Sequence, residues 1–174
     1  GSPEGYSILA LKDLEANTMF YVTDCGWSVS GNNFRFGEQC FGFTVTSAIN
    51  AGTVINISTS GATFTTSGNN INSAFTFQTQ LGSNTGFSNS GDQISIFQGT
   101  PASPTFIYAI NNFGANWAAD ATNSNSSGVP AGLIAGQTAI SYPSLNFFGK
   151  YNGGTITGVA NDIKLAVANI SNWS

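Results

Sequence analysis

The chain consists of short runs of β-branched and aromatic residues, and turn-forming residues separate almost every run from the next. Gly, Asn, Ser and Pro fill the spaces between the runs. Several runs alternate apolar and polar side chains, as in Phe41, Phe43 and Val45. Alternation with a period of two places one face of a strand in a core and the other in water. Strands at this spacing predict an all-β fold, a sandwich or a barrel.

The predicted strands lie at residues 6–11, 18–23, 41–46, 53–58, 63–66, 74–80, 93–98, 105–110 and 138–142. Near the C-terminus the apolar residues recur instead with the spacing of one helix face: Ile163, Ala166, Val167 and Ile170. Asn161 or Asp162 can cap the start of this helix, and Trp173 can anchor its end. We therefore expect an antiparallel β-sandwich with a short C-terminal helix.

The length of 174 residues fits one domain, residues 1–174, without a linker. Only 7% of the residues are charged, against a usual share of about 25%. A surface of amides and hydroxyls suits extracellular proteins and proteins that pack against their own copies, because few charges must be desolvated on contact.

The cations are too few and too scattered for a surface that follows phosphates: Lys12, Arg35, Lys150 and Lys164. The net charge is −4. We therefore expect no nucleic-acid partner. No apolar run approaches the roughly 18 residues of a membrane span, so none is predicted.

Both cysteines, Cys25 and Cys40, lie in one short stretch. The chain has no His, so a zinc site would lack ligands, and a disulfide is the better interpretation. Such a bridge stabilises by about 3 kcal/mol in the chain-entropy model and implies an oxidising compartment. Two free buried thiols are the alternative.

Four sequons for N-glycosylation agree with secretion, and their acceptors are Asn56, Asn125, Asn169 and Asn172. Asn125 is the best candidate among them because it lies in a polar loop. The protein is therefore expected to be secreted, at the cell surface or extracellular.

Asp24 and Glu38 flank the two cysteines and would lie close together once these join. A carboxylate pair for glycoside hydrolysis also needs a sugar-binding cleft, for which the sequence gives no sign. With no His available as a base, we expect no enzyme. A Ca²⁺ site of Asp24, Glu38 and loop carbonyls is one alternative, and no other cofactor is predicted. The other is that Asp24 caps a turn, Glu38 pairs with Arg35 and Trp27 fills the core.

Residues 111–136 form a long loop-like segment, which we expect to be an ordered surface excursion. It contains Trp117, a candidate for stacking on sugar rings in a carbohydrate-binding role. The competing interpretation is that Trp117 is part of the core. Asp92 and Asp120 are interpreted as turn and loop hydrogen-bond acceptors.

Several motifs resemble a family of secreted microbial all-β domains found in cell-surface proteins and beside extracellular hydrolases. The family signature TDxGW…FRxGE is matched by Asp24, Gly26, Trp27, Arg35, Gly37 and Glu38, and its GD before a strand by Gly91 and Asp92. The resemblance implies a sandwich, immunoglobulin-like or lamin-tail-like in style, with a structural or adhesive role.

Two departures from the family pattern matter. The family more often has Asn at the position of Cys25, so the bridge is expected to be an addition in this branch. Family members usually carry another strand before the Gly5-Tyr6-Ser7 segment. Without that strand, the strand at 6–11 or its neighbour has an open edge that invites a strand from another molecule.

These observations together predict a secreted structural protein. A β-sandwich subunit would self-assemble into an extracellular filament, sheath or surface layer, with copies of itself as the partner. The alternative is a carbohydrate- or surface-binding adhesin module, whose partners would be glycans.

Overall fold

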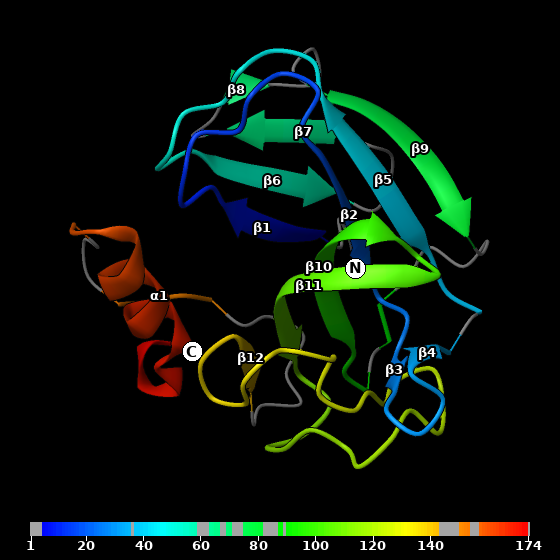
Figure 1. Ribbon diagram of the computed structural model, residues 1–174. Helices are drawn as coiled ribbons and strands as arrows, with labels where there is room; N and C mark the ends of the chain where they lie inside the picture. Colours follow the sequence, from blue (N-terminus) through cyan, green and yellow to red (C-terminus); the bar gives the residue numbers. More distant parts are fainter. Residues whose placement is uncertain are drawn as a thin grey trace.

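The computed structural model describes most of the chain and shows two main sheets, a small hairpin and one short helix (Figure 1). The described residues are 5–35, 37–58, 63–66, 69–70, 75–81, 87–88, 90–142, 150–153 and 157–173. The predicted fold class, an all-β sandwich with a short C-terminal helix, is confirmed.

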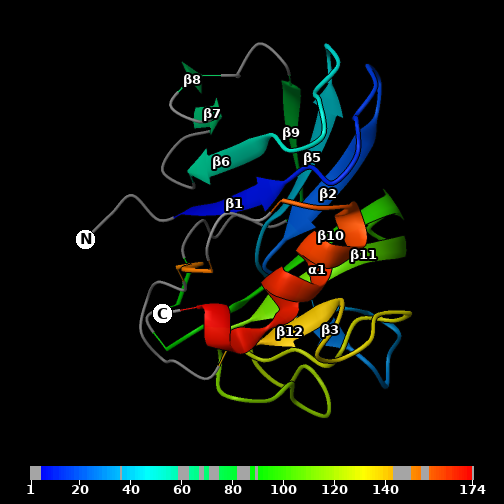
Figure 2. The same cartoon turned by 90° about the vertical axis from the view of Figure 1, so that its left-hand side faces the viewer.

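The first sheet has four antiparallel strands. Their order across the sheet is β1 (Gly5–Leu9), β6 (Val54–Ser58), β7 (Thr63–Thr66) and β8 (Asn69–Asn70). The register of β1 against β6 runs without a break from the Gly5–Ser58 pair to the Leu9–Val54 pair. Strand β1 is thus the last strand on one side of this sheet (Figure 2).

The second sheet has six strands, and only one pair of neighbours in it is parallel, β11 with β12. Their order is β12 (Ala139–Ser141), β11 (Ser103–Asn111), β10 (Gln93–Thr100), β2 (Met19–Thr23), β5 (Cys40–Val45) and β9 (Phe75–Leu81). Along β2, Phe20 and Val22 point to one face while Tyr21 and Thr23 point to the other, and all four are buried. The middle of this sheet therefore has a core on each face.

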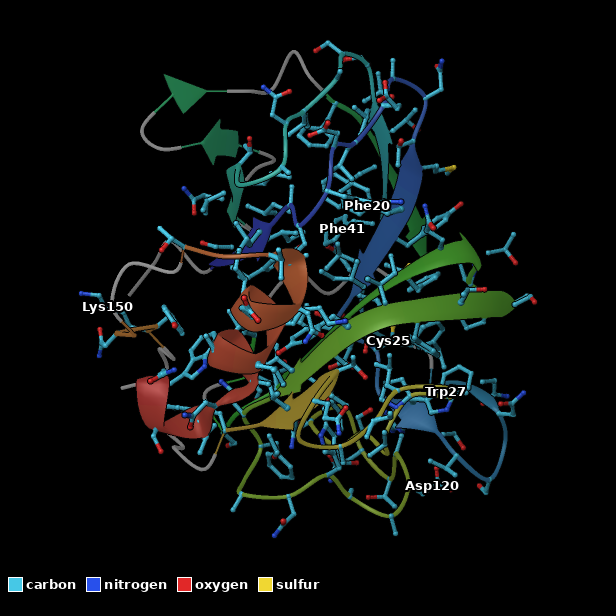
Figure 3. The ribbon with its side chains drawn as sticks, turned by 60° about the vertical axis from the view of Figure 1, so that its left-hand side comes forward. Phe20, Cys25, Trp27, Phe41, Asp120 and Lys150 are labelled. Atoms are coloured by element: carbon cyan, nitrogen blue, oxygen red, sulfur yellow. The ribbon has the colours of Figure 1, made fainter. Side chains whose placement is uncertain are left out.

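The first core lies between the two sheets. Phe20 and Phe43 stack with ring centroids 5.2 Å apart, and Phe75 packs edge-on against both. The first sheet contributes Ile55 and Ile57, which are also buried. Figure 3 shows Phe20 and Phe41 in this space between the sheets. Burial of this apolar surface holds the sandwich together.

The second core lies on the opposite face of the six-stranded sheet, under a hairpin of β3 (Trp27–Ser28) and β4 (Asn33–Phe34). Trp27 is 3% exposed and packs edge-on against Phe34 and Phe106, at 5.2 and 4.9 Å between centroids. Phe97 lies beneath them, stacked on Tyr21. The prediction that Trp27 fills the core is confirmed.

Every predicted strand range coincides with an observed strand to within a few residues. The sequence did not reveal β3, β4 and β8, each only two residues long. Runs this short carry no readable alternation, and Gly, Asn and Ser around them indicate turns instead.

Residues 112–138 wrap the outside of the β3–β4 hairpin. The Gly128 N–H donates to the Trp27 carbonyl at 3.0 Å, and Asp120 accepts hydrogen bonds from the Val29 N–H and the Ser30 hydroxyl. The hydrogen bonds lower the pKa of Asp120 to about 2. Figure 3 shows Trp27 and Asp120 at this end of the molecule. The prediction of an ordered excursion with Asp120 as a loop acceptor is confirmed.

The C-terminal helix α1 (Ala160–Ala168) lies beside β12 and continues into a 3-10 turn at Ile170–Asn172 (Figures 1 and 2). The predicted cap by Asn161 or Asp162 is wrong. The N-cap is Val159, and it makes no side-chain capping bond.

Trp173 anchors the end of this segment, as predicted. Its indole N–H donates to the Val167 carbonyl at 2.8 Å, and its ring packs against Tyr142 and Tyr151. No helix in the described residues is long and apolar enough to cross a membrane.

Replacing Phe97 should test the second core. Phe97 is fully buried, so Phe97→Ala should lower the free energy of unfolding by about 3–5 kcal/mol. Ile107 is 48% exposed, so the control Ile107→Ala should cost less than about 1 kcal/mol. Urea unfolding followed by tryptophan fluorescence measures both. Equal losses in the two variants would contradict the assignment of Phe97 to a core.

Candidate functional site: a buried carboxylate cluster

Three carboxylates gather at one end of the six-stranded sheet. Asp24 follows β2, Glu38 precedes β5 and Asp92 precedes β10. Because β2 lies antiparallel between β5 and β10, its end meets the beginnings of both neighbours. We call Asp24, Glu38 and Asp92 the carboxylate cluster.

Backbone N–H groups hold two of these carboxylates. The Gln39 N–H donates to Asp24 Oδ1 at 2.9 Å. Asp92 Oδ1 accepts from the Gln93 N–H at 2.9 Å, and its Oδ2 accepts from the Ser88 N–H at 3.1 Å. Asp24 therefore accepts from a backbone N–H, but across to the segment before β5 and not within a turn of its own, so its role as a turn cap stays a prediction, whereas Asp92 is the predicted turn acceptor.

The side chain of Gln93 links the cluster to the long loop. Its Nε2 donates to Asp92 Oδ1 at 2.8 Å, to the Asp24 backbone carbonyl, and to the Ser124 carbonyl at 2.9 Å. Gln93 is 1% exposed. One buried amide thus connects the ends of two strands with the 112–138 segment.

Burial and mutual repulsion raise the pKa of two of these acids, Glu38 and Asp24. Desolvation, then Asp92 and Asp24, raise the pKa of Glu38 to about 8, while Arg35 lowers it. Desolvation and Asp92 raise the pKa of Asp24 to about 7. The attraction between Arg35 and Glu38 is weaker than the repulsion of Glu38 by Asp92 or by Asp24. The expected Glu38–Arg35 pairing therefore does not neutralise Glu38, whose raised pKa favours the protonated form at neutral pH.

Several buried oxygens at this cluster have no hydrogen-bond partner. They are Glu38 Oε2, Gln39 Oε1 and Gln93 Oε1, and all are acceptors. The side chains of Glu38, Gln39 and Gln93 are all buried. Buried polar atoms of native proteins nearly always have a partner, so such a group requires an explanation.

The cluster does not resemble a sugar-cleaving site. The cleft beside Asp24 is lined largely by apolar and aromatic side chains, among them Tyr6, Phe41, Phe87 and Ile94. Within the described ranges, no three His, Cys, Asp or Glu side chains are placed to hold a metal ion by themselves. A ligand here would therefore have to use amide or carbonyl oxygens as well. That this protein is not an enzyme stays a prediction.

The two cysteines lie together in the second core. Both are about 1% exposed, and Cys40 stands opposite Thr23, whose hydroxyl accepts from the Cys25 N–H at 3.0 Å. Both are free thiols in the structure. Burial raises the pKa of Cys25 to about 11 and that of Cys40 to about 12. The structure brings the cysteines together, and the bridge between them stays a prediction.

Trp117 is half-buried, and its indole N–H donates to the Ala139 carbonyl at 3.3 Å. This contact fixes the indole against β12 and leaves only part of it open to a sugar ring. Its role in glycan binding stays a prediction.

The four sequon asparagines differ in how their side chains are used. An N-linked glycan is carried by Nδ2 of the asparagine. Asn125 Nδ2 donates to the Gly91 carbonyl, and Asn172 Nδ2 donates to the Ala166 carbonyl. Asn56 accepts a hydrogen bond from Ser7 on β1. Asn169 is exposed and accepts from the Ser171 N–H. Asn169 is thus easier to modify than Asn125, although glycosylation at each site stays a prediction.

The two glutamines of the site, Gln39 before β5 and Gln93 at the start of β10, were not predicted, because a single Gln carries no functional signal. The GD motif was a usable signal for Asp92. Gly91 has φ 100°, and a β-carbon there would collide with the backbone at Asn112, so only glycine fits. Gly26 is equally constrained, by the Ser126 carbonyl.

Comparisons with known proteins give no relative: no family model, curated protein or solved structure matches this chain. The resemblance to the secreted domain family therefore stays a hypothesis, and the function has to be argued from the chain itself.

The raised pKa values predict how stability depends on pH. Without divalent cations, the free energy of unfolding should fall as the pH rises from about 5 to about 8. The unfolded acids release their protons near pH 4, whereas Glu38 and Asp24 hold theirs to about 8 and about 7. The folded state binds more protons in this window, at up to about 1.4 kcal/mol per pH unit for each group.

Urea unfolding at several pH values measures this slope. Glu38→Gln should make the curve flatter, since it removes one of the two titrations. The matched control is Glu15→Gln on the exposed surface, which should leave the slope as it is. A wild-type curve that rises with pH across this window would contradict the prediction.

The disulfide prediction has a direct test in protein from an oxidising compartment. When the protein is unfolded with an alkylating agent but no reductant, we expect no label, and two labels after reduction. Unfolding is required because buried thiols of raised pKa react slowly in the folded state. Two labels without reductant would show free thiols and remove the argument for an oxidising compartment.

Proposed function

We propose that this chain is a secreted structural protein, a β-sandwich subunit that self-assembles into an extracellular filament, sheath or surface layer. The observation that carries the proposal is the presence of two long, uncharged edge strands, β1 and β9. One edge belongs to each sheet.

Strand β1 lacks the charge, proline and bulge that commonly protect an edge. Natural proteins blunt exposed edges with Lys, Pro, bulges or very short strands. The sequence of β1 is GYSIL, five residues without charge or proline, and its ladder to β6 has no bulge. In the described part of the chain, no strand pairs with its outer side.

Strand β9 is the corresponding edge of the other sheet. Its sequence is FTFQTQL, seven residues that again lack charge and proline. No described strand lies on its outer side. The opposite edge strands, β8 and β12, have only two and three residues. The two long edges are therefore the favourable places for strand addition, in which main-chain hydrogen bonds supply the affinity.

Pairing β1 of one subunit with β9 of the next would be a heterologous contact. Contacts of this kind form open chains unless the rotation between subunits closes a ring. With only 7% charged residues, little repulsion opposes such packing. The two open edges and the low charge thus favour a polymer over a symmetric dimer.

The adhesin alternative has less support. It depends on Trp117, whose indole is half-buried and hydrogen-bonded within the fold. Secretion is supported by the sequons and by the placement of both cysteines in one core. Glycans are the expected partners under the adhesin alternative alone.

Lysine substitutions on the two edges should test assembly. Ser7 on β1 and Thr76 on β9 are both exposed, so Ser7→Lys and Thr76→Lys each place a charge on one edge. Each variant should sediment as a monomer at concentrations where the wild type forms polymers. Ser47→Lys adds the same charge in an exposed turn and should polymerise normally.

A mixture of the two edge variants makes the test sharper. Ser7→Lys retains an open β9, and Thr76→Lys retains an open β1, so a mixture should stop at dimers. Analytical ultracentrifugation distinguishes these states. A wild type that remains monomeric at all concentrations would refute self-assembly, and polymers from either variant alone would refute the β1–β9 contact.

A further inference from the structure

The orientation of the Gln93 amide is fixed by its surroundings. Its Nε2 faces three acceptors: Asp92 Oδ1 at 2.8 Å, the Ser124 carbonyl at 2.9 Å and the Asp24 carbonyl. A flipped amide would place its oxygen against three oxygens. This orientation places the amide group against Asp92 and the end of β2, and its Oε1 is buried without a hydrogen-bond partner.

Glu38 supplies a second acceptor of the same kind. Its Oε2 is buried without a hydrogen-bond partner, and the side chain is 7% exposed. The neighbouring charges that act on it most strongly are Asp92 and then Asp24. When Glu38 is ionised, its Oε2 and Gln93 Oε1 cannot satisfy each other, because both accept and neither donates. The ionised form therefore needs an electropositive partner from outside, or a proton on Glu38 in its place. Both lack an electropositive partner.

A cation would supply the charge as well as the partner. Three carboxylates lie here, and Arg35 is the only basic side chain that acts on Glu38, more weakly than the acids do. A bridging water could donate hydrogen bonds, but it would leave the negative charge in place. Hard divalent cations such as Ca²⁺ take six to eight oxygens, from carboxylates, amides, carbonyls and water. Such a site does not require three carboxylate ligands.

We propose that Glu38, Asp92 and the side-chain oxygen of Gln93 form a binding site for Ca²⁺, with water completing the coordination. Asp24 contributes negative charge next to the site, while its Oδ1 accepts from the Gln39 N–H. The structure thus changes the pair suggested by the sequence: Glu38 keeps its role, and Asp92 with Gln93 replaces Asp24 as ligand.

The bound ion would fasten three segments that are distant in the sequence. Glu38 lies between β4 and β5, Asp92 and Gln93 begin β10, and Gln93 holds the 112–138 loop through Ser124. Calcium would therefore stabilise this end of the six-stranded sheet. The proposed Ca²⁺ site does not involve the edge strands β1 and β9, so its test is independent of the test for self-assembly.

Calorimetry and thermal unfolding test the proposal on the same protein. The full chain is dialysed against a chelator, transferred to chelator-free buffer near neutral pH at constant ionic strength, and titrated with CaCl₂ or MgCl₂. We expect one Ca²⁺ per chain and a rise in Tm, with weaker binding of Mg²⁺, because Mg²⁺ is reluctant to lose its water shell. An absence of both heat and Tm shift at millimolar Ca²⁺ would overturn the proposal and leave protons as the neutralising charge.

Isosteric variants locate the site. Glu38→Gln and Asp92→Asn should each weaken Ca²⁺ binding at least tenfold, while Glu15→Gln on the exposed surface should bind like the wild type. Two variants are used so that a folding failure of one leaves the other informative, and circular dichroism confirms the fold. Wild-type affinity in a folded Glu38→Gln or Asp92→Asn protein would place the ion elsewhere and refute the assignment.

Discussion

The burial of β2 on both faces is the constraint on which the rest of the structure depends. Phe20 and Val22 pack toward the first sheet, and Tyr21 and Thr23 pack toward the β3–β4 hairpin. A strand with two buried faces needs a cover on each side. The four-stranded sheet provides one cover, and the hairpin with the long loop provides the other. Two cores follow from one alternating strand.

The same arrangement explains why the acids meet. In an antiparallel sheet the end of one strand adjoins the starts of its two neighbours, so β2 brings together the residues after itself and before β5 and β10. The hairpin and the loop then cover this end of the sheet and exclude water. A chain with only eight carboxylates thus buries three of them in one place. Burial of ionised carboxylates is unfavourable by itself, so the cluster needs a neutralising charge, from protons or from the proposed Ca²⁺.

The open edges are the other consequence of a sandwich that does not close. A barrel would pair its first strand with its last and have no edge. Here two separate sheets leave β1 and β9 at their rims. An ordinary soluble domain would place charges on such rims, whereas the few cations of this chain, such as Lys12 and Arg35, lie outside both strands. Low charge and open edges therefore support the same proposal, a subunit that pairs with its own copies.

The sequence by itself determined the described strands of three or more residues and the C-terminal helix, because the period of apolar residues is a local property. It also indicated that Asp24 and Glu38 are neighbours, although the reason was the expected disulfide between Cys25 and Cys40 and not the order of the strands. Only the tertiary structure decided the order of the strands, the cover by β3 and β4, and the composition of the site. Gln93 and Asp24 are 69 residues apart and meet because β10 lies next to β2. Strand order results from packing both faces of a sheet at once, and no local pattern records it.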